Sequence, residues 1–250
     1  MNDNCIEKIK EYETLFSDNQ YEGSGKNAFI IEEGTIPIMV SAPHAINQFR
    51  EGKVKRADMY TGGIARYLHE ETGCHLIYSC MFTESDPNFD LPGTNSYQET
   101  LKEFVERYSV AVLLDLHGAE KKREYAIEMG TAPEQNPILG VVYEEDPSLH
   151  EHKFISGLIQ NLFEDNFKLC PCERKEVWKN KIFDAGDQNT ITKYISENTD
   201  TACIQLEING IYRDPANQIE FIALIKSLKE LIDILQGIDW TQEVVKIPQI

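Results

Sequence analysis

The chain has 250 residues, of which 41% are apolar and 26% are charged, a composition that fits one α/β domain with a full core. Its 42 acidic side chains outnumber the 24 basic ones and leave a net charge of −18. This charge opposes binding to phosphate backbones and anionic lipid, so we expect neither a nucleic-acid nor a membrane partner.

The sequence predicts a cytoplasmic location. It does not begin with a basic segment followed by an apolar one, and no window approaches the roughly eighteen apolar residues of a membrane span. The six cysteines are scattered, and Cys170-Pro-Cys172 has no second pair at zinc-ribbon spacing. We therefore expect reduced, incidental thiols rather than disulfides or a structural metal clip.

Strand and helix signals alternate along the chain. Apolar residues at helical spacing, from Ile6 to Phe16, predict an N-terminal helix. Strands are expected over 28–32, 36–41, 74–81, 110–116, 125–130 and 202–209. Further helices are expected over 57–71, 96–109 and 148–164, from Asp187 or Asn189, and from Asp214-Pro215 to a stop before Gly237.

This alternation predicts a three-layer α/β/α fold with a central, mostly parallel sheet and helices on both faces. We expect a single domain over 1–250. In such sheets ligands bind beyond the carboxyl ends of the strands. The residues expected there are polar: Ser41-Ala-Pro-His44, Asp86-Pro-Asn88, Asp115-Leu-His117-Gly118, Glu207 and Asn209. Imidazoles and carboxylates at one sheet edge are suited to a catalytic zinc ion with one open position.

Several of these residues also have structural interpretations. A histidine after a strand can be a hydrogen-bonded loop residue, and Asp58 can cap the helix expected to begin there. Asp115 can cap a turn, or it can orient His117 without touching a metal ion. Glu207 lies within an apolar strand, where a carboxylate needs a partner or a metal to offset its desolvation. It can therefore be a metal ligand or form a structural ion pair with Arg213.

Three segments, in this order, resemble the N-formylglutamate amidohydrolase family and, more distantly, aspartoacylases and zinc carboxypeptidases. They are Ser41-Ala-Pro-His44-Ala45, Asp115-Leu-His117-Gly118-Ala119 and Gln205-Leu-Glu207-Ile-Asn209. The resemblance covers roughly residues 25–235. It implies a phosphorylase/hydrolase-like fold, one zinc ion (Zn2+) per chain and hydrolysis of an amide bond. It also implies that His44 and His117 bind the metal and that Glu207 is the general base.

The sequence departs from these relatives at two places. Carboxypeptidase-like relatives have a Glu three residues after the first His, where this chain has Asn47. We assign the third ligand position to Asp58, the nearest acidic residue downstream in a suitable setting. Aspartoacylase relatives carry Asp-x-Asn-Arg, whereas here Phe89 follows Asp86-Pro-Asn88. We expect Asp86, Asn88 and Asn209 to contact substrate, without the usual Arg.

Three arginines are candidates for the missing cation. Arg213, six residues beyond Glu207, is the expected catalytic cation, and Arg50 and Arg56 are expected substrate-binding residues, because a guanidinium can hold a carboxylate in two parallel hydrogen bonds. The expected reaction is hydrolysis of an N-acyl amino acid or a small peptide-like amide. The alternative is a binding or regulatory protein on the same fold. A Ser hydrolase is disfavoured because no Gly-x-Ser-x-Gly elbow occurs.

Overall fold

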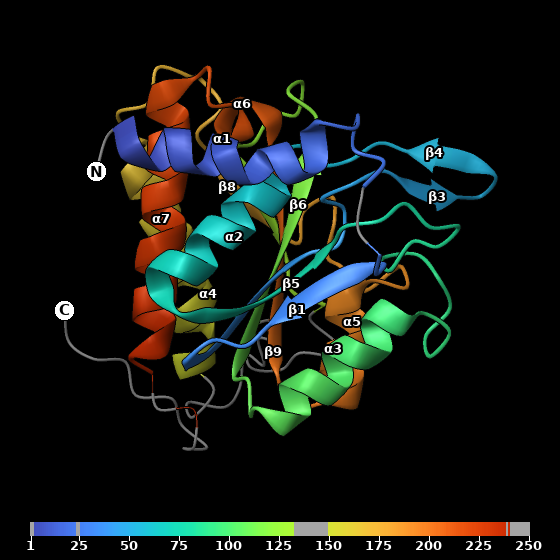
Figure 1. Cartoon of the computed structure of the whole chain (residues 1–250). Coiled ribbons are helices and arrows are strands. Elements are labelled where there is room, and N and C mark those ends of the chain that lie inside the picture. The colour runs from blue at the N-terminus through green and yellow to red at the C-terminus, as the bar shows by residue number, and fades with distance from the viewer. Residues whose placement is uncertain (1–2, 24–25, 133–149, 239, 241–250) are drawn as a thin grey trace.

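The structure, a computed structural model, describes residues 3–23, 26–132, 150–238 and 240. Seven strands form one sheet in the order β1-β5-β2-β6-β9-β7-β8, and Figure 1 shows helices on both sides of it. In that order the strands are β1 (Phe29–Glu32), β5 (Cys74–Ser79), β2 (Ile36–Ala42), β6 (Val112–Ala119), β9 (Ala202–Asn209), β7 (Ile127–Gly130) and β8 (Val177–Lys179).

The sheet is mixed and mostly parallel. Its four central strands, β5, β2, β6 and β9, are parallel to one another, and β7 and β8 also pair in parallel. The edge strand β1 runs antiparallel to β5, and β7 runs antiparallel to β9. The predicted fold class is therefore confirmed, and the carboxyl ends of β2, β6 and β9 meet at one edge.

Two apolar clusters cover the two faces of the sheet. Alternate strand residues such as Val40, Leu114 and Leu206 pack in the larger cluster, whereas Met39 and Leu113 pack in the smaller one, as the period of two in a strand requires. The larger cluster includes residues of α1 (Asp3–Ser17), α2 (Thr61–Thr72), α4 (His150–Phe167) and α7 (Gln218–Gln236). The smaller cluster includes residues of α3 (Ser96–Arg107) and α5 (Ile191–Asn198).

Most of the predicted elements are present, with shifted ends. Strand 202–209 is confirmed without change, and α2 ends at Gly73, whose φ of 76° makes it a left-handed C-cap. However, α2 begins at Thr61 instead of 57. The strand predicted over 110–116 runs to Ala119, so His117 lies inside β6.

Two further predicted helix starts were wrong. The helix expected from Asp187 or Asn189 begins at Ile191, because the hydroxyl of Thr190 caps it by accepting from the amide of Lys193. The last helix begins at Gln218 rather than at Asp214-Pro215, where the Asp214 carboxylate instead accepts from the amide of Ala216 in a turn.

Some features were not predicted, and some predicted positions lie outside the described residues. The hairpin of β3 (Gln48–Arg50) and β4 (Lys53–Lys55), strand β8 and the one-turn helix α6 (Gly210–Arg213) had no sequence signal. Residues 148–149, the expected start of α4, and residue 25, the expected start of the core, lie outside the description.

All six cysteines lie within the described residues and none forms a disulfide, as expected. Among the helices described, none is both long enough and apolar enough to cross a bilayer.

Candidate metal centre

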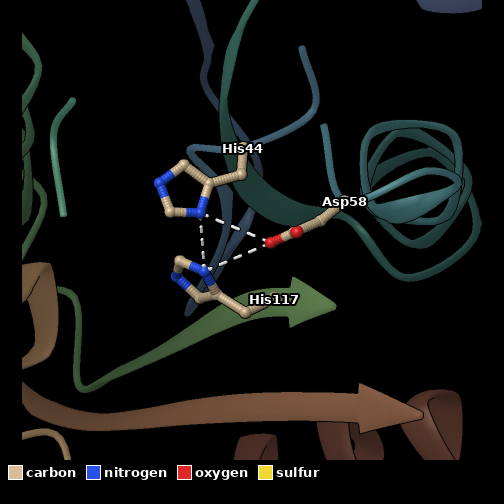
Figure 2. A group of neighbouring side chains, drawn as sticks. All are labelled: His44, Asp58 and His117. Atoms are coloured by element: carbon tan, nitrogen blue, oxygen red, sulfur yellow. Dashed lines mark hydrogen bonds and ion pairs between the residues drawn. The ribbon is translucent and has the colours of Figure 1, made fainter. Parts of the chain in front are cut away.

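Three side chains converge at the carboxyl edge of the sheet (Figure 2). His44 comes two residues after β2, His117 lies in β6, and Asp58 lies in the turn that precedes α2. The pairing of Ser41 with Asp115 sets β2 and β6 side by side at this edge. All three side chains are buried. Among the described residues they form the one group of three or more His, Cys, Asp or Glu side chains with metal-binding spacing.

The distances within this group fit a zinc ion. The Nδ1 atoms of His44 and His117 are 3.0 Å apart, and Oδ2 of Asp58 lies 3.3 Å from the first and 3.5 Å from the second. Zinc bonds of about 2.0–2.2 Å in tetrahedral geometry put ligand atoms about 3.3–3.6 Å apart. The two distances from Asp58 lie in this range, and the distance between the two Nδ1 atoms is shorter. The donor set of two imidazoles and one carboxylate also matches catalytic zinc.

The outer nitrogen of each imidazole is held by a carboxylate. Nε2 of His44 lies 2.8 Å from Oδ1 of Asp86, and Nε2 of His117 lies 2.9 Å from Oδ2 of Asp115. Such partners fix the ring orientation and make the inner nitrogen a better ligand. The second interpretation of Asp115, that it orients His117, is therefore what its contact supports. Asp86, expected to bind substrate, is engaged with His44.

The carboxylates strongly shift the pKa values of the side chains in this group. Burial disfavours the charged form of His117, but Asp115 and Asp58 outweigh it and raise the pKa of His117 to about 10. Burial also opposes the charged form of Asp58, yet Lys55 and the two histidines hold the pKa of Asp58 well below its usual value. The pKa of Asp86 is lowered despite burial, chiefly by His44. His117 is therefore protonated at neutral pH when no metal is bound.

Lys55 is a neighbour of the site that the sequence reasoning missed. Its Nζ lies 3.2 Å from Oδ1 of Asp58, the carboxylate oxygen that faces away from the histidines. The lysine thus leaves Oδ2 for a metal ion. No sequence signal marked it, because the three-residue strands of the β3–β4 hairpin are too short to show a periodic pattern.

Asp58 does not cap α2. The N-cap position of α2 is Tyr60, which has φ of 70° and no side-chain cap. The carboxylate of Asp58 faces Lys55, His44 and His117 instead. The helix-cap interpretation of Asp58 is therefore wrong, and its carboxylate belongs instead to the group that it forms with His44 and His117.

Glu207 lies beside the metal group on the next strand. It is paired in register with His117, so both side chains stand on the same face of the sheet. Its Oε1 accepts a hydrogen bond from Nε2 of Gln205 at 2.9 Å. No ion pair between Glu207 and Arg213 occurs in the described part of the chain. Its role as general base stays a prediction.

Arg213 stands on the other face. It is only 8% exposed, and its three nitrogens donate to the backbone carbonyls of Ile208, Ala119 and Met59. A Cβ added to Gly118 would clash with Nη2 of Arg213. Because Gly118 and His117 are consecutive strand residues, this places the guanidinium opposite the His117 side chain. Among the described residues, no hydrogen bond or ion pair joins the Arg213 side chain to the side chains of His44, Asp58 or His117.

The other two arginines differ in their surroundings. The Arg50 guanidinium lies 4.0 Å from the centre of the Phe89 ring, and its Nη2 donates to Oε1 of Gln188 at 3.4 Å. These contacts join β3 to the two loops that hold Phe89 and Gln188. Arg56 is exposed on the chain leading to Asp58.

Both asparagines of the expected substrate set are bonded to backbone. Oδ1 of Asn88 accepts from the amide of Ile191 at the start of α5. Oδ1 of Asn209 accepts from the amide of Ile211, and its Nδ2 donates to the carbonyl of Tyr125. These contacts tie loops around the site together. Direct substrate contact by either asparagine stays a prediction.

No protein-family model and no curated protein matches the chain. Among solved structures, gene product Atu2144 from Agrobacterium tumefaciens superposes with a TM-score of 0.51 at 13% identity, covering 90% of this chain and 97% of that one. N-formylglutamate amidohydrolase from Ralstonia eutropha has a TM-score of 0.49 at 12% identity, with coverages of 83% and 96%. A bacteriophage poly-gamma-glutamate hydrolase has a TM-score of 0.49 at 15% identity, with coverages of 86% and 92%. At these identities the likeness to the Atu2144 product establishes a shared α/β fold, and the reaction is a separate question.

Proposed function

We propose that this chain is a zinc-dependent hydrolase, built as a single domain, that cleaves the amide bond of an N-acyl amino acid or a small peptide-like substrate. One observation carries the proposal. Two imidazole Nδ1 atoms and one carboxylate oxygen face one another at 3.0 to 3.5 Å, while carboxylates hold both outer nitrogens. Two buried histidines held in this way have the ring orientation that a metal ion needs.

His44, His117 and Asp58 would hold the ion. When bound, zinc supplies a Lewis acid that polarises an amide carbonyl and acidifies water. Asp86 and Asp115 keep the two imidazoles in place by accepting from their Nε2–H groups. Lys55 keeps one oxygen of Asp58 away from the histidines. Three protein ligands leave a position for substrate, as hydrolysis requires.

We assign the proton transfer to Glu207. It stands beside His117 and is partly exposed, so a water molecule and a substrate can reach it. Because Gln205 donates to Oε1, the other carboxylate oxygen is left to take the proton from the attacking water. The protonated carboxyl then gives this proton to the leaving nitrogen, which completes general acid–base catalysis of amide hydrolysis.

Arg50 is the arginine best placed to recognise a substrate carboxylate. Arg213 uses its three nitrogens on backbone carbonyls, whereas Arg50 lies at the junction of the loops that hold Phe89 and Gln188. Its guanidinium stacks on Phe89, the residue that stands where aspartoacylase relatives have Arg. The β3–β4 hairpin would thereby supply the cation from another part of the chain.

Metal analysis tests the proposal. Purified protein equilibrated with zinc and desalted is expected to retain about one zinc ion per chain. The double variant His44→Ala/His117→Ala should retain almost none, and His69→Ala, which removes a histidine on α2 outside the group, should bind as wild type does. Full zinc retention by the double variant would contradict the metal centre.

Turnover tests the reaction. The zinc-loaded protein is incubated with formyl, acetyl, aspartyl and γ-glutamyl amides, and release of free amine is measured. Hydrolysis of one class that is lost in the double variant would support the proposed enzyme. Stoichiometric zinc binding without turnover of any amide would favour the binding-protein alternative.

A further inference from the structure

Helix α2 begins without a cap of its own, directly after the metal-ligand turn. Its N-cap residue, Tyr60, has φ of 70°, and its side chain makes no capping hydrogen bond. The first amides of a helix have no partner within the helix and need acceptors from elsewhere. A left-handed conformation at a non-glycine residue also needs support from its surroundings.

Glu13 of α1 supplies these acceptors from far away in the sequence. Its Oε1 accepts from the amide of Tyr60 at 2.6 Å, and its Oε2 accepts from the amide of Gly63 at 3.0 Å. Glu13 is only 3% exposed. A Cβ on Gly63 would lie 2.8 Å from Oε2 of Glu13 and 2.9 Å from the carbonyl oxygen of Ile9, so glycine is what lets α1 come this close.

The same turn carries Asp58. The carbonyl of Asp58 accepts from the amide of Thr61 at 3.1 Å and from its hydroxyl at 2.7 Å. The amide of Asp58 donates to the carbonyl of His44 at 2.8 Å. Asp58 is thus only two residues from the amide that Glu13 holds, and any movement of Tyr60 shifts its backbone relative to His44.

A second contact links the N-terminal segment to the other side of the turn. Asn47 donates through its backbone amide to the carbonyl of Tyr21 at 2.7 Å and through Nδ2 to that of Gln20 at 3.0 Å. Its Oδ1 accepts from the amide of Ala57 at 2.9 Å. The hydroxyl of Tyr21 donates to Oε1 of Glu13 at 3.0 Å. Residues on both sides of Asp58 are therefore tied to the segment from 13 to 21.

We infer that Glu13 is a positioning residue for the metal centre, which holds the Asp58 carboxylate at its place opposite His44 and His117 by capping α2 from outside. The inference rests on the proposed metal site. Burial raises the pKa of Glu13 to about 7 against the effect of its backbone donors, so the carboxylate is costly where it lies. A capping side chain within α2 itself would avoid the cost of burying the Glu13 carboxylate. Capping by Glu13, in contrast, ties the turn that carries Asp58 to α1.

The test compares Glu13→Gln with wild type by zinc affinity. Glutamine keeps the shape of the side chain but turns an NH2 group toward one of the two backbone amides. We expect the zinc dissociation constant to rise at least about tenfold while circular dichroism shows a folded protein. The d–d absorption of the cobalt-loaded variant should change as the Asp58 oxygen is lost from the metal. The matched control is Glu220→Gln, a buried glutamate of α7 that accepts from the amide of Cys172, which should leave zinc affinity within twofold of wild type.

A milder variant guards against misfolding. Tyr21→Phe removes one donor to Glu13 and should raise the zinc dissociation constant by a few-fold in the same direction. Hydrogen exchange at the amides of Tyr60 and Gly63 reports whether the cap itself is lost. Faster exchange at these amides with unchanged zinc affinity and cobalt spectrum would overturn the inference and leave the metal site intact. Zinc binding by His44→Ala/His117→Ala equal to wild type would instead overturn the proposed function, and the inference with it.

Discussion

At the same edge of the sheet, the two faces of β6 and β9 carry polar side chains with different roles. On one face, His117 and Glu207 lie side by side, and Asp115 holds the outer nitrogen of His117. On the other face, the guanidinium of Arg213 lies above Gly118 and donates its hydrogen bonds to backbone carbonyls. Neighbouring residues of one strand point to opposite faces. A charged residue near a sheet edge therefore serves a site only if its register brings it to the site's face.

Replacing Arg213 by Met should have the largest effect and should act on stability. The substitution leaves three carbonyls without their donor, and each unsatisfied buried group costs about 1–3 kcal/mol. We expect the free energy of unfolding, measured by urea denaturation, to fall by about 3 kcal/mol or more. At temperatures where the variant is folded, its KM should stay close to that of wild type.

Arg66→Met is the control for that experiment. The Arg66 guanidinium stacks on the ring of Tyr12 at the half-exposed surface of α2, and its loss should cost below about 1 kcal/mol. A stable Arg213→Met protein with a strongly raised KM would contradict the assignment of Arg213 to the other face, because it would put the guanidinium on the substrate side.

Glu207→Gln should have the next largest effect and should act on catalysis. Glutamine cannot take up the proton, so kcat is expected to fall on the order of a hundredfold or more. Zinc content and melting temperature should stay near those of wild type, since Glu207 is outside the group of His44, Asp58 and His117 and outside any ion pair of the described residues. A folded, zinc-loaded variant with near-normal kcat would remove Glu207 from the mechanism.

Sequence patterns were sufficient where structure depends on local periodicity. The apolar run of β9 predicted a buried strand with Glu207 within it, and alternating elements predicted a mostly parallel sheet. That logic also predicted that His44 and His117 would meet at one edge, and Asp58 joins them. What these features share is that a strand's period and direction fix where its residues lie.

Patterns failed where distant segments decide the structure. The start of α2 was placed too early because its acceptor, Glu13, lies on another helix. Lys55 was missed because its strand is too short to show a periodic pattern. Its ion pair with Asp58 forms only in the folded chain. Arg213 was expected in the site because its distance from Glu207 in sequence does not show the face on which it lies.

The proton on His117 should make zinc binding depend on pH. In the metal-free protein the pKa of His117 is raised from 6.5 to about 10, so its Nδ1 is protonated at pH 7.5 and must lose that proton to bind metal. Zinc affinity should therefore rise about tenfold per pH unit between pH 7 and 9. Calorimetry in buffers of different ionisation enthalpy should show about one proton released.

Stability of the metal-free protein should change in the opposite direction. Because the folded pKa of His117 lies above the unfolded one, its contribution to the free energy of unfolding is fully present below pH 6.5 and is lost as the pH rises toward about 10.

A zinc affinity that is flat between pH 7 and 9 would show that His117 is already neutral in the metal-free site.

The smallest effect is expected at Arg50, and this variant tests which cation binds the substrate on the face of His117 and Glu207. Arg50→Ala removes the guanidinium stacked on Phe89, and KM for amides that carry a free carboxylate should rise several-fold, or about 1 kcal/mol, with kcat little changed. Arg56→Ala, which removes an exposed cation six residues away, is the control and should leave KM near its wild-type value. KM for neutral amides should be the same in both variants and in wild type, since no carboxylate is there to be held. If Arg50→Ala raised KM equally for neutral and acidic amides, the contacts of Arg50 with Phe89 and Gln188 would be acting on loop structure, and the substrate would be bound without a guanidinium on this face.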